Sequence, residues 1–225
     1  SGSHTYAVFF ERVGQVAAAL CDLGIVAEQR VMMCMLDTID FAAVFWGAIR
    51  IGAIPVPVNT LLKGQDYDYM LRDSRAPLLI VSSELYGEFA GVVDEQPFLK
   101  HVLVSGQHPK GGLDLDSLIA TAPSSPSVAD TTCDDAAFWL YTSGSTGTPK
   151  GVSHHQSDLY HTACLYADQV LGITPDDRVF SAAKLFFAYG LGNAMTFPLH
   201  VGASAALLTS RPTPDAVLDM LLVQV

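Results

Sequence analysis

The stretch Tyr141-Thr-Ser-Gly-Ser-Thr-Gly-Thr-Pro-Lys150-Gly151 decides how the rest of the chain is interpreted. It follows the apolar run 136–140, which predicts a buried strand leading into it. Gly144 and Gly147 allow turns in which a Cβ would clash, so that backbone N–H groups can face one concavity. Because the loop also carries five hydroxyl side chains and Lys150, it is suited to binding a polyphosphate.

Three other interpretations of this loop fit its residues less well. A Walker A motif has Gly-x4-Gly-Lys-Ser/Thr, but here Pro149 precedes the lysine and Gly151 follows it. A Gly-x-Ser-x-Gly nucleophile elbow is one residue longer than Gly144-Ser145-Thr146-Gly147. A flexible Ser/Thr/Gly linker is the third alternative, although linkers seldom combine a Pro-Lys-Gly end with a buried strand before it.

The stretch resembles the phosphate-binding signature of the adenylate-forming superfamily, which includes acyl-CoA synthetases, peptide-synthetase adenylation domains and beetle luciferases. Asp134-Asp135, just upstream, is also usual in that superfamily. Three further segments are similar to the N-terminal domain of acyl-CoA synthetases: Thr5-Tyr6 opening a helix, residues 52–59, and Leu71-Arg72-Asp73-Ser74 before an apolar strand. The resemblance covers essentially the whole chain and implies that a carboxylate is activated with ATP.

The composition describes a globular chain that is long enough to form a substantial core. Of its 225 residues 50% are hydrophobic and 16% charged. A net charge of −11 without a basic cluster argues against a nucleic-acid surface, and the longest apolar run, 41–49, is too short to span a membrane. The four cysteines are scattered and no secretory segment opens the chain, so we expect reduced thiols and a cytoplasmic location.

Strand-like and helix-like segments alternate, which predicts an α/β fold with mostly parallel, layered sheets flanked by helices. Helices are expected at 5–23, 39–51, 65–73, 84–91, 155–171 and 214–225, and strands at 30–36, 53–58, 78–82, 101–104, 136–140, 177–181 and 203–208. Pro55 and Pro57 place their strand at a sheet edge or a strand end. We predict an N-terminal α/β subdomain at 1–104, a loop-rich connection at 105–132, and a second, incomplete subdomain at 133–225 that carries the phosphate loop and the start of the acid pocket.

The aromatic-rich segment 184–193, Lys-Leu-Phe-Phe-Ala-Tyr-Gly-Leu-Gly-Asn, resembles the version found in benzoate–CoA ligases and close aryl-CoA ligases. By that resemblance Ala188, Tyr189 and Gly190 lie against the aryl carboxylate, in an apolar slot that a flat acid requires. Gly190 and Gly192 favour a close approach of the backbone to a ligand. The alternative is that the aromatic residues are core residues at the start of a helix. Lys184 is expected either to reach solvent or to pair with a carboxylate.

The sequence gives no reason to assign metal ligands. His154, His155 and His161 fit neither zincin nor zinc-finger spacing, and we interpret them as helix-start and surface residues. Asp176-Asp177 predicts a turn with capping carboxylates and no metal pair.

The resemblance implies a reaction in two steps. An aryl carboxylate attacks the α-phosphorus of MgATP to give an acyl-adenylate and pyrophosphate, and coenzyme A then displaces AMP to give a thioester. Positioning and charge neutralisation would provide most of the first step. We expect Lys150 and Thr146 to be the catalytic groups of the loop, with Thr146 nearest the phosphates and Mg²⁺. The residues expected to bind the ATP phosphates are Thr142, Ser143, Gly144, Ser145, Thr146, Gly147, Thr148 and Lys150.

Parts of the family pattern are missing from this sequence. It contains no Tyr-Gly-x-Thr-Glu segment, which in relatives meets adenine and magnesium, and no small C-terminal domain with a catalytic lysine. We therefore expect part of a longer ligase that does not complete adenylation alone, and the family suggests a homodimer. The alternatives are another carboxylate-activating enzyme, such as a medium-chain acyl-CoA synthetase or an adenylation domain, and a non-catalytic nucleotide-binding module.

Overall fold

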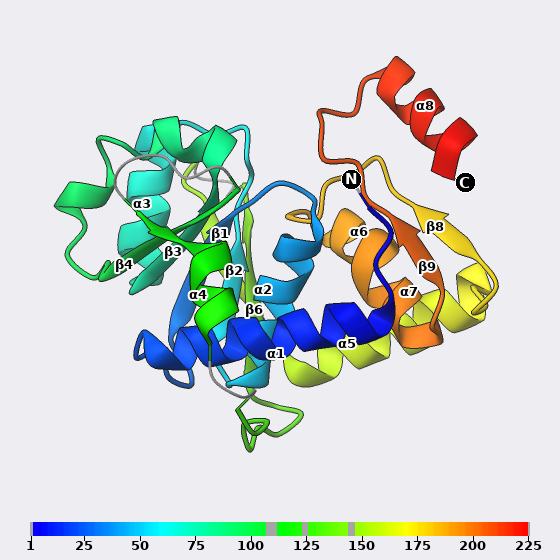
Figure 1. The fold of residues 1–225 in the computed structure, drawn as a ribbon, viewed down its shortest axis with the longest axis horizontal. Helices are drawn as coiled ribbons and strands as arrows, with labels where there is room; N and C mark the ends of the chain where they lie inside the picture. Colours follow the sequence, from blue (N-terminus) through cyan, green and yellow to red (C-terminus); the bar gives the residue numbers. More distant parts are fainter. Residues whose placement is uncertain (1, 107–111, 123–125, 144–146, 225) are drawn as a thin grey trace.

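A five-stranded sheet with helices on both faces forms the larger part of the molecule (Figure 1). The computed structural model describes residues 2–106, 112–122, 126–143 and 147–224. Every neighbouring pair in this sheet is parallel, in the order β2-β1-β3-β4-β5. The strands are β1 (Arg30–Cys34), β2 (Ile54–Pro57), β3 (Leu78–Ser82), β4 (His101–Ser105) and β5 (Leu113–Asp114). The predicted α/β class with a mostly parallel sheet is confirmed.

Side chains of the central strands alternate between two cores, because successive residues of a strand point to opposite faces. In β1, Val31 and Met33 belong to one core, whereas Met32 and Cys34 belong to the other. All four are fully buried. Both faces of the sheet are therefore apolar, as expected for parallel strands covered by helices on each side.

Different helices cover the two faces. The first core contains residues of α1 (Tyr6–Asp22), α2 (Ile39–Arg50) and α4 (Leu115–Thr121). The second contains residues of α3 (Gly64–Ser74), η1 (Ser83–Glu88) and η2 (Val93–Glu95) or residues next to them. The helix expected at 5–23 is confirmed: the Thr5 hydroxyl accepts a hydrogen bond from the Val8 amide at 3.3 Å, and Gly24, at φ 75°, follows its end.

Strand β2 lies at the edge of the five-stranded sheet and pairs only with β1. Its Pro55 and Pro57 have no N–H to donate, so the edge is the position that tolerates them. The edge placement predicted from these prolines is confirmed. Strand β6 (Ala136–Thr142) packs beside β2 and begins the second half of the chain.

The second half contains an antiparallel hairpin and a smaller parallel pair. The hairpin consists of β6 and β7 (Lys150–His155), and the parallel pair consists of β8 (Arg178–Phe180) and β9 (Ser204–Ala206). The helical segments are α5 (Gln156–Thr162), the π-helical η3 (Ala163–Leu171), α6 (Ala188–Leu191), η4 (Gly192–Thr196), α7 (Phe197–Val201) and α8 (Pro214–Gln224). Helix α8 stands apart from the rest of the ribbon in Figure 1. Strand β7 was not predicted, because Lys-Gly-Val-Ser-His-His lacks apolar alternation.

One hydrophobic core joins the two halves. Phe138 and Leu140 of β6, and Leu191 of α6, belong to the same buried cluster as Val16 of α1 and Phe45 of α2. The segment between the two halves, residues 105–132, also contributes two buried residues to this core, Leu115 and Ile119. The subdomain boundaries at 1–104, 105–132 and 133–225 stay a prediction.

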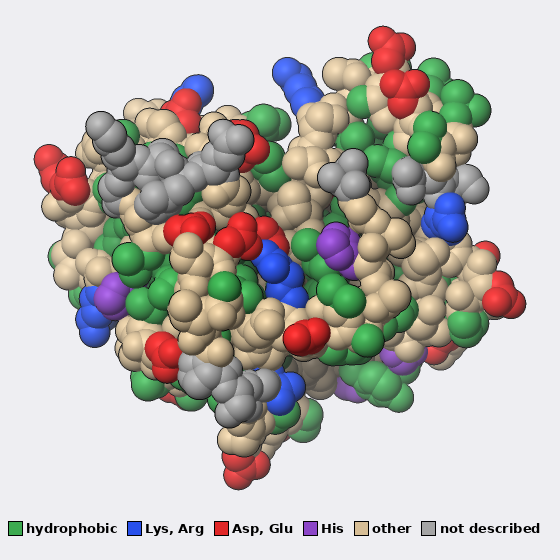
Figure 2. Space-filling view, in the orientation of Figure 1, with side chains coloured by type: hydrophobic (Ala, Val, Ile, Leu, Met, Phe, Trp, Pro, Cys, Tyr) green, Lys and Arg blue, Asp and Glu red, His purple; other side chains and the backbone are tan. Residues whose placement is uncertain are grey.

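Charged side chains are distributed over the surface without a large basic region on the face in view. Lys and Arg occur there as separate groups among acidic side chains (Figure 2). The whole chain has 12 Lys and Arg against 23 Asp and Glu. Among the described residues no helix has both the length and the apolar character needed to cross a bilayer.

Candidate functional site

The predicted phosphate loop connects the two strands of the β6–β7 hairpin. Thr142 pairs with Lys150 at the end of the hairpin next to the loop, and Tyr141 pairs with Gly151. The loop residues Thr142, Ser143, Gly147, Thr148 and Lys150 are described and exposed. Gly144, Ser145 and Thr146, to which phosphate contacts were also assigned, lie outside the described residues.

The described part of the loop has the features of an anion site. Gly147 has φ +85°, in the left-handed region, and a Cβ built there meets no heavy atom within 4 Å. The amides of Gly147 and Thr148 donate to no described backbone carbonyl outside the strand ladder. Within the described part of the chain Lys150 forms no ion pair, so its charge is available to a ligand. Open amides beside a lysine are the arrangement that holds phosphate oxygens.

Two tyrosines fasten the base of this loop to helix α3. The Tyr141 hydroxyl donates to Asp73 Oδ2 at 2.7 Å, and the Tyr69 hydroxyl donates to the Pro149 carbonyl at 3.1 Å. Burial raises the pKa of Tyr141, and its hydrogen bond to Asp73 raises that pKa further. In the sequence, residues 71–74 were informative only through their similarity to acyl-CoA synthetases. The structure gives Asp73 a role: it accepts the hydrogen bond that fixes one end of the loop.

The predicted acid-binding residues lie at the start of α6. Leu185 and Phe186 are buried, whereas the side chains of Phe187 and Tyr189 are 50% and 67% exposed. Phe186 is a core residue, as the alternative for these aromatic residues expected, but Phe187 and Tyr189 face outward. Tyr189 is therefore accessible to a ligand, and Ala188 beside it is exposed as well.

The glycines of this segment are explained by close packing of the chain itself. A Cβ on Gly190 would lie 2.0 Å from the Lys184 carbonyl oxygen, and one on Gly192 would lie 2.7 Å from the Phe197 ring. Neither position has room for a larger residue. This is a different reason for glycine from the close ligand approach inferred from the sequence, so the contact of Gly190 with a carboxylate stays a prediction.

A buried ion pair connects the segment before α6 to the residues that follow β1. Lys184 Nζ lies 3.8 Å from Asp37 Oδ2, and the two side chains are 14% and 5% exposed. The Lys184 ammonium also donates to the carbonyls of Leu208 and Ser210, and the Leu185 amide donates to Asp37 Oδ1 at 3.2 Å. Of the two alternatives for Lys184, pairing with a carboxylate is the one observed.

Burial acts on the pKa values of both partners. Desolvation raises the pKa of Asp37 from 3.8 to about 6, although the facing Lys184 charge and the Leu185 amide act in the opposite direction. Desolvation lowers the pKa of Lys184, with Asp37 opposing that change. At this separation, the free energy lost by removing the two charges from water exceeds the free energy gained from their attraction.

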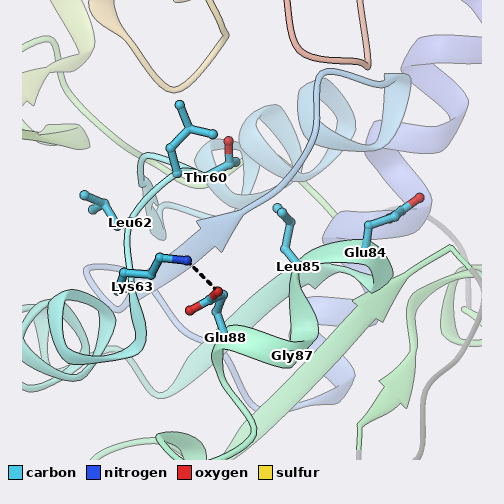
Figure 3. Close-up of a pocket in the computed structure, with 8 residues that line it drawn as sticks. Thr60, Leu62, Lys63, Glu84, Leu85, Gly87 and Glu88 are labelled. Atoms are coloured by element: carbon cyan, nitrogen blue, oxygen red, sulfur yellow. Dashed lines mark hydrogen bonds and ion pairs between the residues drawn. The ribbon is translucent and has the colours of Figure 1, made fainter.

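The structure also contains a pocket of about 300 Å³, formed by segments that follow β2 and β3 (Figure 3). Its lining includes Thr60 and Leu62 on one side and Leu85 on the other. Lys63 and Glu88 point toward one another and form an exposed ion pair at 3.0 Å. Because this lysine already faces a carboxylate, the pocket is a poor anion site, and none of the predicted site residues lines it.

The predicted phosphate-binding residues and the predicted acid-binding residues lie on different parts of the molecule. The predicted phosphate loop is carried by the β6–β7 hairpin, next to β2, whereas Ala188 and Tyr189 belong to α6, which packs on η4 and lies near α7 in Figure 1. Between the described residues of the loop and those of α6 there is no hydrogen bond or ion pair. Both groups are nevertheless joined to one body, through β6 and through the Asp37–Lys184 pair.

Comparison with known proteins agrees with these features. The sequence pattern of the family described as AMP-binding enzyme matches residues 1–224. The chain is 50% identical over 222 residues to a benzoate–CoA ligase of Thauera aromatica, and 42% identical over 219 residues to a 4-hydroxybenzoate–CoA/benzoate–CoA ligase of Rhodopseudomonas palustris. Its fold is similar to that of a benzoate CoA ligase from Burkholderia xenovorans LB400, with a TM-score of 0.91 and 44% identity over 99% of this chain.

These relatives are much longer than the chain. The matches cover 98% and 97% of this chain but only 42% and 40% of the two curated ligases, and 44% of the solved structure. The chain therefore spans less than half of each relative.

Removing the Tyr141 hydroxyl is expected to loosen the base of the phosphate loop. Tyr141→Phe should lower the free energy of unfolding by about 1.5 kcal/mol, because a hydrogen bond to a carboxylate is lost while the exposed Asp73 regains water. Urea unfolding monitored by circular dichroism measures this change. Tyr166→Phe removes a hydroxyl that has no described hydrogen-bond partner and should change stability by less than about 0.5 kcal/mol. Equal stabilities of the two variants would contradict the anchoring role.

The Asp37–Lys184 pair predicts a pH dependence of stability. Because the pKa of Asp37 is higher in the folded chain, the folded state binds its proton more tightly, and stability falls as pH rises from about 4 to about 6. The difference between 3.8 and about 6 corresponds to a loss of up to ~3 kcal/mol.

Asp37→Asn should remove this component, whereas Asp22→Asn, at an exposed position, should keep it. Urea unfolding at several pH values between about 4 and 7 measures the difference from the unchanged chain. A parallel pH dependence in the chain and in Asp37→Asn would contradict the assignment.

Proposed function

Since this chain belongs to the AMP-binding enzyme family, we propose that it is the ATP-binding part of an aryl-CoA ligase that acts on benzoate or a close analogue. The observation that carries the proposal is the β6–β7 loop, in which open amides, a left-handed Gly147 and a Lys150 with no ion pair to any described residue lie together on a fixed base. The names of the relatives reported above support an aromatic acid as the substrate.

The first step of the proposed reaction joins the acid to AMP. A carboxylate oxygen forms a bond to the α-phosphorus of ATP while the bond from that phosphorus to the α,β-bridging oxygen breaks, and pyrophosphate leaves. The loop amides and the Lys150 ammonium hold the β- and γ-phosphates and offset the negative charge that builds up on the leaving group. Thr142, Ser143 and Thr148 add hydroxyl donors from the described part of the loop.

The second step of the proposed reaction transfers the acyl group to coenzyme A. Its thiol sulfur forms a bond to the carbonyl carbon of the acyl-adenylate while the bond from that carbon to the phosphate oxygen of AMP breaks. AMP leaves and the thiol proton passes to solvent, so that the thioester forms without further ATP. The acid itself is proposed to lie against Ala188, Tyr189 and Gly190, where the exposed tyrosine ring offers a flat apolar surface.

Three further elements of the proposal follow from the family and not from a contact in this chain. Mg²⁺ would accompany the ATP phosphates near Thr146, which lies outside the described residues. The protein is proposed to form a homodimer. It is placed in the cytoplasm, in keeping with cysteines 21, 34, 133 and 164, which are all free thiols.

Loss of the Lys150 charge tests the phosphate assignment. Lys150→Ala should weaken ATP binding by roughly 10- to 100-fold, because a charge-assisted hydrogen bond to phosphate is removed, and Thr146→Ala should weaken it as well. Calorimetric titration of the chain with MgATP measures both effects. Lys100→Ala removes another exposed lysine, in the loop before β4, and should leave the affinity unchanged. Unchanged ATP binding in both loop variants would refute the assignment.

The acid specificity is tested in the same chain. With MgATP present, benzoate and its hydroxy or amino analogues should bind more tightly than medium-chain aliphatic acids or amino acids. Tyr189→Ala should weaken benzoate binding by roughly two- to tenfold through loss of aromatic contact. Phe10→Ala is the matched control, because this ring is 61% exposed and lies on α1. Preference for aliphatic acids would favour a medium-chain acyl-CoA synthetase instead.

A further inference from the structure

A thiol, a carboxylate and an imidazole converge between η3 and α7, away from the phosphate loop. Cys164 Sγ lies 3.8 Å from His200 Nε2, and Asp168 Oδ2 lies 3.1 Å from the same nitrogen. All three ligand atoms lie within 4.8 Å of one another. This is the Cys164–Asp168–His200 cluster.

The backbone under the cluster is held by a small apolar core. Ala163, Ala167 and Phe197 are buried against one another where η3 packs on α7. Cys164 and Asp168 each follow one of these alanines, and His200 is three residues after the phenylalanine. The ligand side chains therefore start from fixed positions on two packed helices, as a binding site requires. The π-helical form of η3 is itself rare and occurs frequently at functional sites.

The two distances from His200 Nε2 are close to edges of a tetrahedron around a small divalent ion. With Zn–S near ~2.3 Å and Zn–N and Zn–O near ~2.0–2.1 Å, tetrahedral angles place S and N ~3.6 Å apart and N and O ~3.3 Å apart. The observed separations of 3.8 Å and 3.1 Å each differ from these edges by about 0.2 Å. The third separation, between Cys164 Sγ and Asp168 Oδ2, is at most 4.8 Å, so binding of one ion would draw these two atoms toward each other.

A nucleophilic triad is a different arrangement of the same residue types. In such a triad the imidazole receives the thiol proton at one ring nitrogen and donates from the other nitrogen to the carboxylate. Here both Cys164 and Asp168 approach Nε2. A single nitrogen cannot relay a proton between them, but one ion can bind all three ligand atoms.

We propose that Cys164, Asp168 and His200 form a zinc-binding site with three protein ligands. Thiolate and imidazole ligands select Zn²⁺ over Mg²⁺ or Ca²⁺, which prefer oxygen. On binding, the Cys164 thiol loses its proton to the buffer and coordinates as a thiolate. The bound ion links η3 to α7, two segments that also pack through Ala163, Ala167 and Phe197.

Cobalt is the probe that tests this site, because Co²⁺ substitutes for Zn²⁺ in tetrahedral sites and is coloured. Titration of the untagged chain with Co²⁺ should give one bound ion per chain, with a thiolate-to-cobalt charge-transfer band, and Zn²⁺ should abolish the band. Cys164→Ser should lose the band, and His200→Gln and Asp168→Asn should each weaken cobalt binding by at least about tenfold. The controls Cys133→Ser and His4→Gln alter exposed residues elsewhere and should leave the titration unchanged.

A second measurement uses only the unchanged chain. Zn²⁺ should slow the alkylation of Cys164 by iodoacetamide more than about tenfold, read from peptide masses, while the exposed Cys21 and Cys133 react at the same rate with or without the ion. Absence of a charge-transfer band in the unchanged chain, or a band that persists in Cys164→Ser, would overturn the proposal. So would equal alkylation rates of Cys164 with and without Zn²⁺.

Discussion

The carboxylate of Asp37 is the point at which the two parts of this molecule are joined most specifically. It follows β1, is 3% exposed, and meets a lysine and a backbone amide from a segment 148 residues further along the chain. The Thr209 hydroxyl donates to the Asp37 carbonyl, so a third segment meets the same residue. Burying this pair lowers stability relative to leaving both charges in water. The Asp37–Lys184 pair nevertheless fixes the position of the segment before α6, and therefore the position of Tyr189.

The β6–β7 loop depends on a different arrangement, in which hydrogen bonds and packing hold the ends of the loop. Strand β6 places Leu140 in one core and Tyr141 in the other, so the strand entering the loop is held on both faces. Hydrogen bonds from Tyr69 and Tyr141 then tie the hairpin to α3. Beyond this base Gly147 has open space around it, and Lys150 extends without a described partner. Such preorganisation lets amides face an anion without first being rearranged.

Local patterns were sufficient to predict most of the sheet and its helices. Thr5 and Gly24 mark the ends of α1, apolar runs mark β1, β3 and β4, and two prolines mark the edge strand β2. The features that escaped prediction depend on distant residues or on weak periodicity. Strand β7 forms because it pairs with β6, and the Asp37–Lys184 pair joins positions that no spacing rule relates. The Cys164–Asp168–His200 cluster arises in the same way, from helices packed against each other.

The proposed function requires the β6–β7 loop to bind the polyphosphate of a nucleotide, and competition with inorganic tripolyphosphate tests this binding most directly. The chain is titrated with ATP, with AMP, and with ATP in the presence of tripolyphosphate. If the loop grips the β- and γ-phosphates, ATP binds more tightly than AMP and tripolyphosphate displaces it. Equal affinities for ATP and AMP, with no displacement by tripolyphosphate, would contradict the account.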